Sequence, residues 1–211
     1  MKFSELLSLI AEEPIFSSSL LLSGKVNDRQ VRLQLSRWVK SGQLVQLRRG
    51  LYALDVPWRK VEPHPFLIAN RQHPGSYVSL QSALAWHGAI PEQVQIVTSV
   101  GPGRPETTNT PLGTYKLQHL TDALCFGFAR IEVAPRQNAF VASPEKALLD
   151  LVHLTPGGDS SGFLRELRLQ NLSAFQHTVL KEMARRSGKP KLMRASVIIS
   201  SLLDGEEGEA L

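Results

Sequence analysis

The apolar positions of residues 27–40 repeat with the period of an α-helix. Asn27 is a good N-cap residue, and Asp28 places a negative charge in the first turn, where the helix dipole favours it. The apolar side chains that follow share one face: Val31, Leu35, Trp38 and Val39. Ser41-Gly42 comes next, and glycine is the usual residue for the left-handed turn that ends a helix. The pattern therefore predicts one amphipathic helix here.

Two short apolar runs after this helix have the character of strands. Residues 44–47 and 51–54 flank Arg48-Arg49-Gly50, so we expect a β-hairpin with a basic tip. An amphipathic helix followed at once by a small hairpin is the arrangement of a winged helix-turn-helix. Such a helix can lie in the major groove of DNA, where base edges are distinguishable.

The segments on either side of this unit complete a first domain. Apolar residues at helical spacing predict a helix over residues 4–12, and residues 17–22 predict a second, short one. Three prolines between residues 57 and 65 break regular structure. We therefore place the domain boundary near residue 60, with a DNA-binding domain over residues 1–60 and a second domain over 61–211.

The second domain mixes both patterns before it ends in helices. Expected elements are a helix from residue 66, a helix over 79–87, strands over 93–100, 107–109, 113–120, 126–133 and 139–141, and helices over 144–154, 163–169, 173–186 and 191–203. Asp150 and His153 lie three apart on one of these helices, which is the spacing of a simple surface pair. The fold class is thus α+β: an N-terminal winged helix-turn-helix followed by a mixed α/β domain ending in helices.

Positive charge is concentrated around the first helix and hairpin. Residues 25–60 hold nine basic and two acidic side chains, or +7, whereas the whole chain is +5. A clustered basic face is the electrostatic footprint of a DNA-binding module, although a solvated helix with long charged side chains gives the same pattern. The residues that we expect to contact DNA are Arg29, Gln30, Arg32, Ser36, Arg37, Lys40, Arg48 and Arg49.

Composition narrows the class of protein. The hydrophobic share of 42% and the charged share of 20% are those of a folded protein. The N-terminus MKFSELLSLIAEEP has acids where a signal peptide needs an apolar core, so we expect a cytoplasmic location. The single cysteine, Cys125, excludes an internal disulfide and a zinc site of several cysteines.

The sequence contains no motif that indicates an enzyme active site. No HExxH, Walker-type P-loop or GxSxG pattern occurs, and the histidines are scattered. No constellation of nucleophile, base and orienting group can be assembled. We therefore expect no enzymatic activity, no catalytic residues, no cofactor and no metal.

Several segments resemble one family. VQLRRGLYAL, residues 45–54, resembles the wing of AbiEi-type antitoxins, the regulatory half of type IV (abortive-infection) toxin–antitoxin pairs. Residues 77–92 with 97–120 resemble the start of that family's second domain, and ASPEKALLDLVHL, residues 142–154, resembles a helix late in it. The segments follow the family's order and span most of residues 17–175.

The resemblance implies a transcriptional autorepressor with antitoxin function. Its N-terminal domain would bind inverted repeats in double-stranded DNA at its own promoter, with the basic positions at Arg48 and Arg49 and the helix before them. Its second domain would counter a nucleotidyltransferase-like toxin without forming a stable complex. One helix and hairpin cover a single half-site, so we expect two copies on each operator.

Two alternatives remain from the sequence. One is a protein-interaction module in which the winged domain is a scaffold, although a scaffold does not need +7 confined to its helix and hairpin. The other is a solitary winged-helix regulator without a toxin partner.

Overall fold

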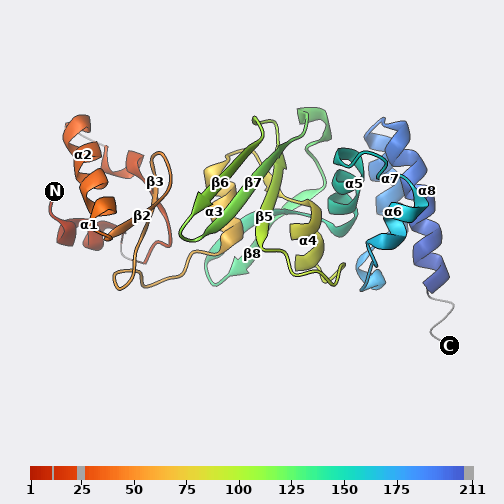
Figure 1. Ribbon diagram of the computed structural model, residues 1–211, viewed down its shortest axis with the longest axis horizontal. Helices are drawn as coiled ribbons and strands as arrows, with labels where there is room; N and C mark the ends of the chain where they lie inside the picture. The colour runs from red at the N-terminus through yellow and green to blue at the C-terminus, as the bar shows by residue number, and fades with distance from the viewer. Residues whose placement is uncertain (11, 23–26, 207–211) are drawn as a thin grey trace.

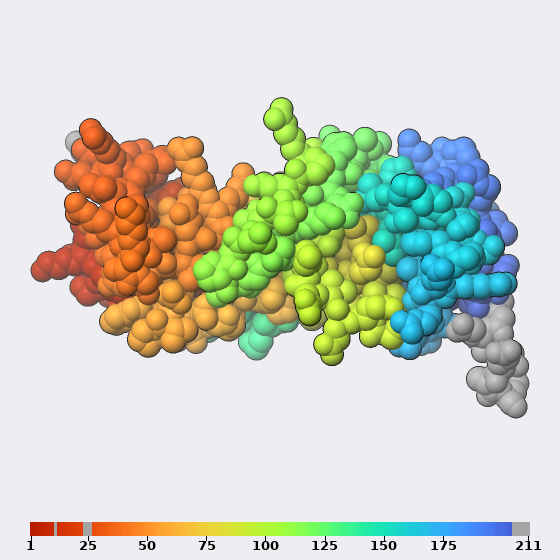
Figure 2. All heavy atoms as spheres, viewed as in Figure 1, coloured from red at the N-terminus to blue at the C-terminus, as the bar shows by residue number. Residues whose placement is uncertain are grey.

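The protein is elongated, with its N-terminal residues at one end and a group of helices at the other (Figure 1). The computed structural model describes residues 1–10, 12–22 and 27–206. The space-filling view shows the N-terminal part packed directly against the middle of the molecule (Figure 2).

The N-terminal part combines helices with a small antiparallel sheet. Its elements are α1 (Phe3–Ile10), β1 (Phe16–Ser17), the 3₁₀ helix η1 (Ser18–Leu21), α2 (Asp28–Lys40), β2 (Leu44–Arg48) and β3 (Leu51–Leu54). Among the described residues this sheet has three strands in the order β1-β3-β2. The expected first helix, basic helix and hairpin are confirmed. The short helix expected over residues 17–22 is confirmed in part: Phe16 and Ser17 first pair with β3, and a 3₁₀ helix follows over Ser18–Leu21.

The ends of α2 are set by local side-chain chemistry. The Asn27 carboxamide oxygen accepts a hydrogen bond from the Gln30 backbone N–H at 3.1 Å, which satisfies one of the free donors of the first turn. At the other end Gly42 has a φ of +69°, the left-handed conformation that glycine adopts without strain. Both the Asn27 cap and the Gly42 terminus were predicted from the sequence.

The remainder of the chain forms a mixed sheet with helices. Its elements are α3 (Pro65–Gln72), β4 (Tyr77–Val78), α4 (Leu80–Trp86), β5 (Ile96–Gly101), β6 (Glu106–Thr110), β7 (Gly113–His119), η2 (Asp122–Leu124), β8 (Phe128–Ala134), β9 (Gln137–Ala142), α5 (Pro144–Leu154), α6 (Ser161–Glu166), η3 (Leu172–Ala174), α7 (His177–Arg186) and α8 (Pro190–Glu206). Within the described residues six strands pair in the order β6-β7-β5-β4-β9-β8. The α+β class is confirmed. The two-residue strand β4 was not expected, because it is too short to leave a pattern.

The β2–β3 hairpin belongs to two hydrophobic cores at once. Side chains alternate between the faces of a strand, so Leu44 and Tyr52 pack with α1 and α2 while Leu47 and Ala53 pack with α3 and the second domain. All four residues of β3 are buried. The expected domain boundary near residue 60 falls in the segment that joins β3 to α3, yet the two parts share a continuous apolar contact.

A fully buried ion pair anchors α5 to the large sheet. The ammonium of Lys146 donates a hydrogen bond to the carboxylate of Asp150, and both side chains are almost completely buried. The hydroxyls of Tyr77 and Ser79 also donate to this carboxylate, at 3.0 and 2.8 Å. The expected surface pair of Asp150 with His153 is therefore wrong, because Asp150 faces the sheet.

Burial dominates the protonation chemistry of this cluster. It raises the pKa of Asp150, against the opposing effect of Lys146 and of the hydroxyl donors. It also raises the pKa of Tyr77, so the phenol stays protonated and keeps donating to Asp150. The buried ammonium of Lys146 and the buried carboxylate of Asp150 thus each have a partner inside the protein.

Removing one partner of this pair should cost much stability. Lys146→Ala leaves the Asp150 carboxylate buried without its cation, so we expect the free energy of unfolding to fall by about 3–5 kcal/mol. Urea denaturation followed by circular dichroism measures the change. The double variant Lys146→Met with Asp150→Leu should recover most of the stability lost in Lys146→Ala. If the double variant is as unstable as Lys146→Ala, the buried, uncompensated carboxylate is not the cause of the loss.

Candidate nucleic-acid interface

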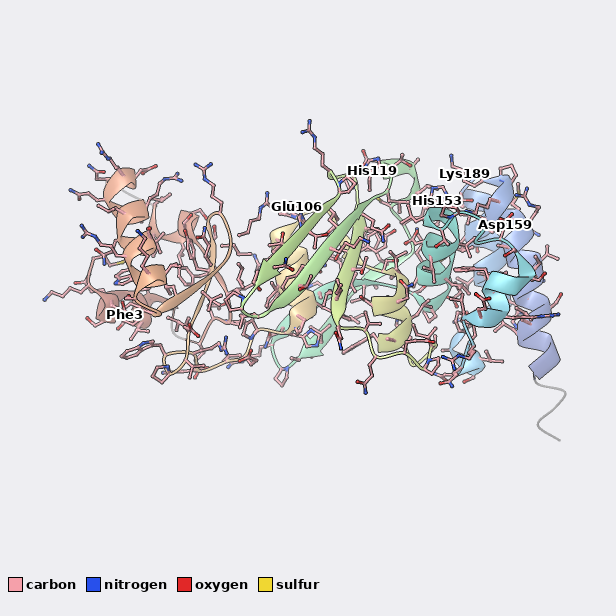
Figure 3. The ribbon with its side chains drawn as sticks, in the orientation of Figure 1. Phe3, Glu106, His119, His153, Asp159 and Lys189 are labelled. Carbon is pink, nitrogen blue, oxygen red and sulfur yellow. The ribbon has the colours of Figure 1, made fainter. Side chains whose placement is uncertain are left out.

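The side chains expected to contact DNA are all exposed. Six of them lie on α2, and two are at the hairpin tip: Arg29, Gln30, Arg32, Ser36, Arg37, Lys40, Arg48 and Arg49. Figure 3 shows nitrogen-tipped side chains projecting from α2 away from the body of the protein. The face of α2 that carries Leu35 and Trp38 is buried in the N-terminal core. The helix thus presents its basic side to solvent, as its amphipathic pattern predicts.

Among the described residues, no acidic neighbour pairs with the positive charges of this surface. In the described part of the chain, none of the five cations Arg29, Arg32, Arg37, Lys40 and Arg49 forms an ion pair. Other arginines do so, as in the pair of Arg194 with Asp159 at 2.7 Å. Lys25, counted in the sequence as part of the basic region, lies outside the described residues. An exposed, unpaired basic helix is an arrangement that attracts phosphates.

One apolar residue on α2 was missed by sequence reasoning. Leu33 is 52% exposed although its neighbour Leu35 is buried. It follows Arg29 by four residues and precedes Arg37 by four, so it lies between them on the solvent face. The signal was present, because Leu33 falls outside the apolar stripe. An exposed leucine there offers an apolar contact within an otherwise polar surface.

The two hairpin arginines have different surroundings. Arg48 is the last residue of β2, and its guanidinium donates a hydrogen bond to the backbone carbonyl of Gln72 at the end of α3. Arg49 begins the turn, with Gly50 at a φ of +84° after it, and its side chain is exposed. The sequence placed both arginines at one tip, whereas the structure turns Arg48 toward the second domain.

A reciprocal contact holds the hairpin to α3. The side-chain amide of Gln72 donates to the carbonyl of Leu47 at 2.9 Å, while the Gln72 carbonyl accepts from Arg48. The adjoining residue, His73, is buried, and burial lowers the pKa of its imidazole, an effect that Glu106 partly opposes. The ring is thereby kept neutral beside the Arg48 guanidinium. The base of the hairpin is fixed to the second domain by hydrogen bonds as well as by apolar packing.

The described residues were also compared with the requirements of a metal site, a reactive cysteine and a membrane-spanning helix. They contain no group of three or more His, Cys, Asp or Glu side chains that could hold a metal ion. Cys125 is partly buried, and burial raises the pKa of its thiol, which opposes formation of the nucleophilic thiolate. No helix among these residues has both the length and the apolar character needed to cross a membrane.

Comparisons with known proteins relate the N-terminal part to a regulator family. Residues 5–54 match the family model described as "Transcriptional regulator, AbiEi antitoxin". The resemblance read from the hairpin is thus confirmed for this segment, and the resemblance of residues 77–154 lies outside the match. A search of curated proteins found no match.

A solved structure supports the fold of nearly the whole chain. The crystal structure of RV2827C protein from Mycobacterium tuberculosis is similar, with a TM-score of 0.55 and 18% sequence identity over 94% of this chain and 76% of that one. At this identity the likeness shows the fold alone: N-terminal helices followed by a mixed sheet and further helices.

The different surroundings of the two hairpin arginines predict different stabilities. Arg48→Ala removes a charged donor and leaves the Gln72 carbonyl unpaired, so we expect a loss of about 1–3 kcal/mol in the free energy of unfolding. Arg49→Ala should change it by no more than about 0.5 kcal/mol, as is usual for an exposed residue without partners. Urea denaturation of the two variants measures both, and equal effects would contradict the contact with α3.

Proposed function

We propose that this chain, whose residues 5–54 match AbiEi antitoxin regulators, is a DNA-binding transcriptional repressor of its own operon. We assign it the antitoxin role in a type IV pair whose toxin is a nucleotidyltransferase-like protein, and a place of action in the cytoplasm. The observation that carries the DNA-binding part is the exposed basic face of α2, whose cations form no ion pair with any described residue, together with the exposed Arg49 of the hairpin tip.

The order of the N-terminal elements supports a winged helix-turn-helix. A helix, a short strand, a helical turn, the basic helix and a two-stranded hairpin follow one another, and the first strand pairs beside the hairpin. In such a domain the second helix of the motif enters the major groove. Here that helix is α2, since its basic face is the one that faces solvent.

In the proposed complex, some residues of α2 and the hairpin would contact base edges and others would contact phosphates. Arg29, Gln30 and Arg32 lie in its first turns, where recognition helices contact base edges; arginine suits guanine and glutamine suits adenine. Leu33 offers a contact to a thymine methyl group. Lys40 and Arg49 at the periphery would hold phosphates, which positions the helix without reading sequence.

A single helix and hairpin read one half-site, so two copies would occupy an inverted repeat. The second domain would counter the toxin without a stable complex.

A mobility shift with DNA from upstream of the gene tests the DNA binding on which the proposed repression depends. We expect tighter binding to this DNA than to a scrambled duplex of the same composition, in two steps as two copies bind. The affinity should fall steeply with salt, because phosphate contacts release counterions. Absence of binding at low salt would exclude the DNA-binding role.

Matched variants sharpen this experiment. Arg29→Ala should reduce the preference for the upstream DNA, whereas Lys40→Ala with Arg49→Ala should weaken binding to both duplexes and flatten the salt slope by about two. Lys181→Ala, an exposed cation on α7 at the other end of the molecule, serves as the control and should change neither property.

Antitoxin function is tested by co-expression with the nucleotidyltransferase-like gene that this proposal expects beside its own. We expect the full chain to restore growth that the toxin alone arrests, and the two proteins not to co-purify. A variant lacking DNA binding, such as Lys40→Ala with Arg49→Ala, should still protect when both genes are expressed from foreign promoters. Continued growth arrest in the presence of the wild-type chain would reject the antitoxin assignment.

A further inference from the structure

Two exposed aromatic rings lie next to each other at one margin of the large sheet. Phe128 on the edge strand β8 is 38% exposed, and Phe140 on β9 is 44% exposed. Their ring centroids are 5.9 Å apart, and the rings are nearly perpendicular. Figure 1 places β8 at the lower margin of the view, away from the basic helix α2. Isolated exposed apolar residues are common, but an adjacent pair on neighbouring strands forms a small aromatic surface.

The aromatic surface packs on a buried tyrosine and includes an arginine. Tyr77 on β4 stacks against Phe128 with centroids 4.3 Å apart and an angle of 15° between the rings. Its hydroxyl is in turn bound to Asp150. Arg130 lies directly opposite Phe140 in the β8–β9 register, so both side chains leave the same face of the sheet.

A groove opens beside this surface. It has a volume of about 490 Å³ and runs between the chain before β1, the end of α3 and the β8–β9 hairpin. Phe140 and Arg130 line it, together with two further arginines, Arg71 and Arg136. Glu13 is the one acidic residue of its described lining.

The arginines give the groove a net positive charge. Arg136 pairs with Glu12 at 2.8 Å, while Arg71 and Arg130 form no ion pair with any described residue. Asn70 closes the groove at β9, where its carboxamide bonds the backbone N–H and carbonyl of Phe140 and so fixes that strand against α3. Arg71, Arg130 and the exposed ring of Phe140 therefore line one groove together.

We propose that the aromatic surface and this groove bind a short single-stranded nucleic-acid segment. Aromatic rings on the strands of a sheet are stacking platforms for unpaired bases, and arginines beside them contact the phosphates between those bases. Phe140 would stack a base, Arg130 and Arg71 would hold the adjoining phosphates, and the groove would receive the next nucleotide.

The chemistry favours a single strand over other occupants. A duplex keeps its bases stacked on each other, so it could use the arginines but would leave the aromatic rings without a partner. An acidic peptide would likewise satisfy the charges without needing the flat face of Phe140. The combination of ring and guanidinium matches the alternation of base and phosphate along one strand.

Fluorescence anisotropy of labelled ten-nucleotide oligoadenylate, as RNA and as DNA, tests the proposal on the full chain. We expect salt-dependent binding that Phe140→Ala and Phe140→Leu each weaken by about fivefold or more, since leucine keeps the apolar volume but loses the stacking face. Phe140→Trp should retain the affinity. Arg71→Ala with Arg130→Ala should flatten the salt slope by about 1.4, the value for two phosphate contacts on a single strand.

Matched controls separate this site from the proposed duplex interface. Trp86→Ala and Arg104→Ala replace an exposed aromatic and an exposed arginine outside the groove, and each should leave oligonucleotide binding unchanged. Lys40→Ala with Arg49→Ala should weaken duplex binding alone, while the Phe140 variants should weaken oligonucleotide binding alone. Thermal unfolding by circular dichroism confirms that each variant is folded.

Four results would overturn the inference. The first is no oligonucleotide binding at low salt, and the second is binding that the Phe140 and arginine variants leave intact. The third is equal competition by polyglutamate, with an affinity independent of Phe140, because it would show an electrostatic surface that does not recognise bases. Loss of oligonucleotide binding only in the α2 variant would assign the binding to the duplex interface.

Discussion

The structure depends on one hairpin that is buried on both faces. Because side chains alternate along a strand, β2 and β3 send Leu44 and Tyr52 into the N-terminal core and Leu47 and Ala53 into the core of the second domain. Burial of apolar area on both sides, with hydrogen bonds from Gln72 and Arg48, fixes the hairpin between them. The orientation of α2 relative to the large sheet follows from this contact.

Charge is arranged in opposite ways inside and on the surface. Lys146 and Asp150 are out of water, and each is compensated by its partner, with Tyr77 and Ser79 completing the carboxylate's hydrogen bonds. The cations of α2 are exposed to solvent and have no acidic partner among the described residues. In the first arrangement each charge compensates the other inside the fold, whereas the second leaves positive potential available to an external polyanion.

Most local structure of the N-terminal part could be predicted from its residues. The Asn27 cap, the apolar stripe of α2 and the Gly42 terminus act within one or two helical turns, so the chain itself contains the information. The exposed basic residues of the candidate site follow from the same periodicity. Leu33 completes that surface and was overlooked only because it is apolar. The strand at Phe16 and Ser17 was not predicted, because a two-residue strand forms only through its pairing with β3.

The sequence alone determined which face of α2 is basic, where that helix begins and ends, and that a hairpin with an arginine tip follows it. Tertiary structure decided what each charged side chain does. It turned Arg48 toward Gln72, buried Asp150 against Tyr77, and brought Phe128 and Phe140 together. Periodicity reports which side of an element is apolar, because that depends on neighbours within a few residues. Partners separated by 24 or 73 positions, as Arg48–Gln72 and Tyr77–Asp150 are, meet only when the sheets and helices pack.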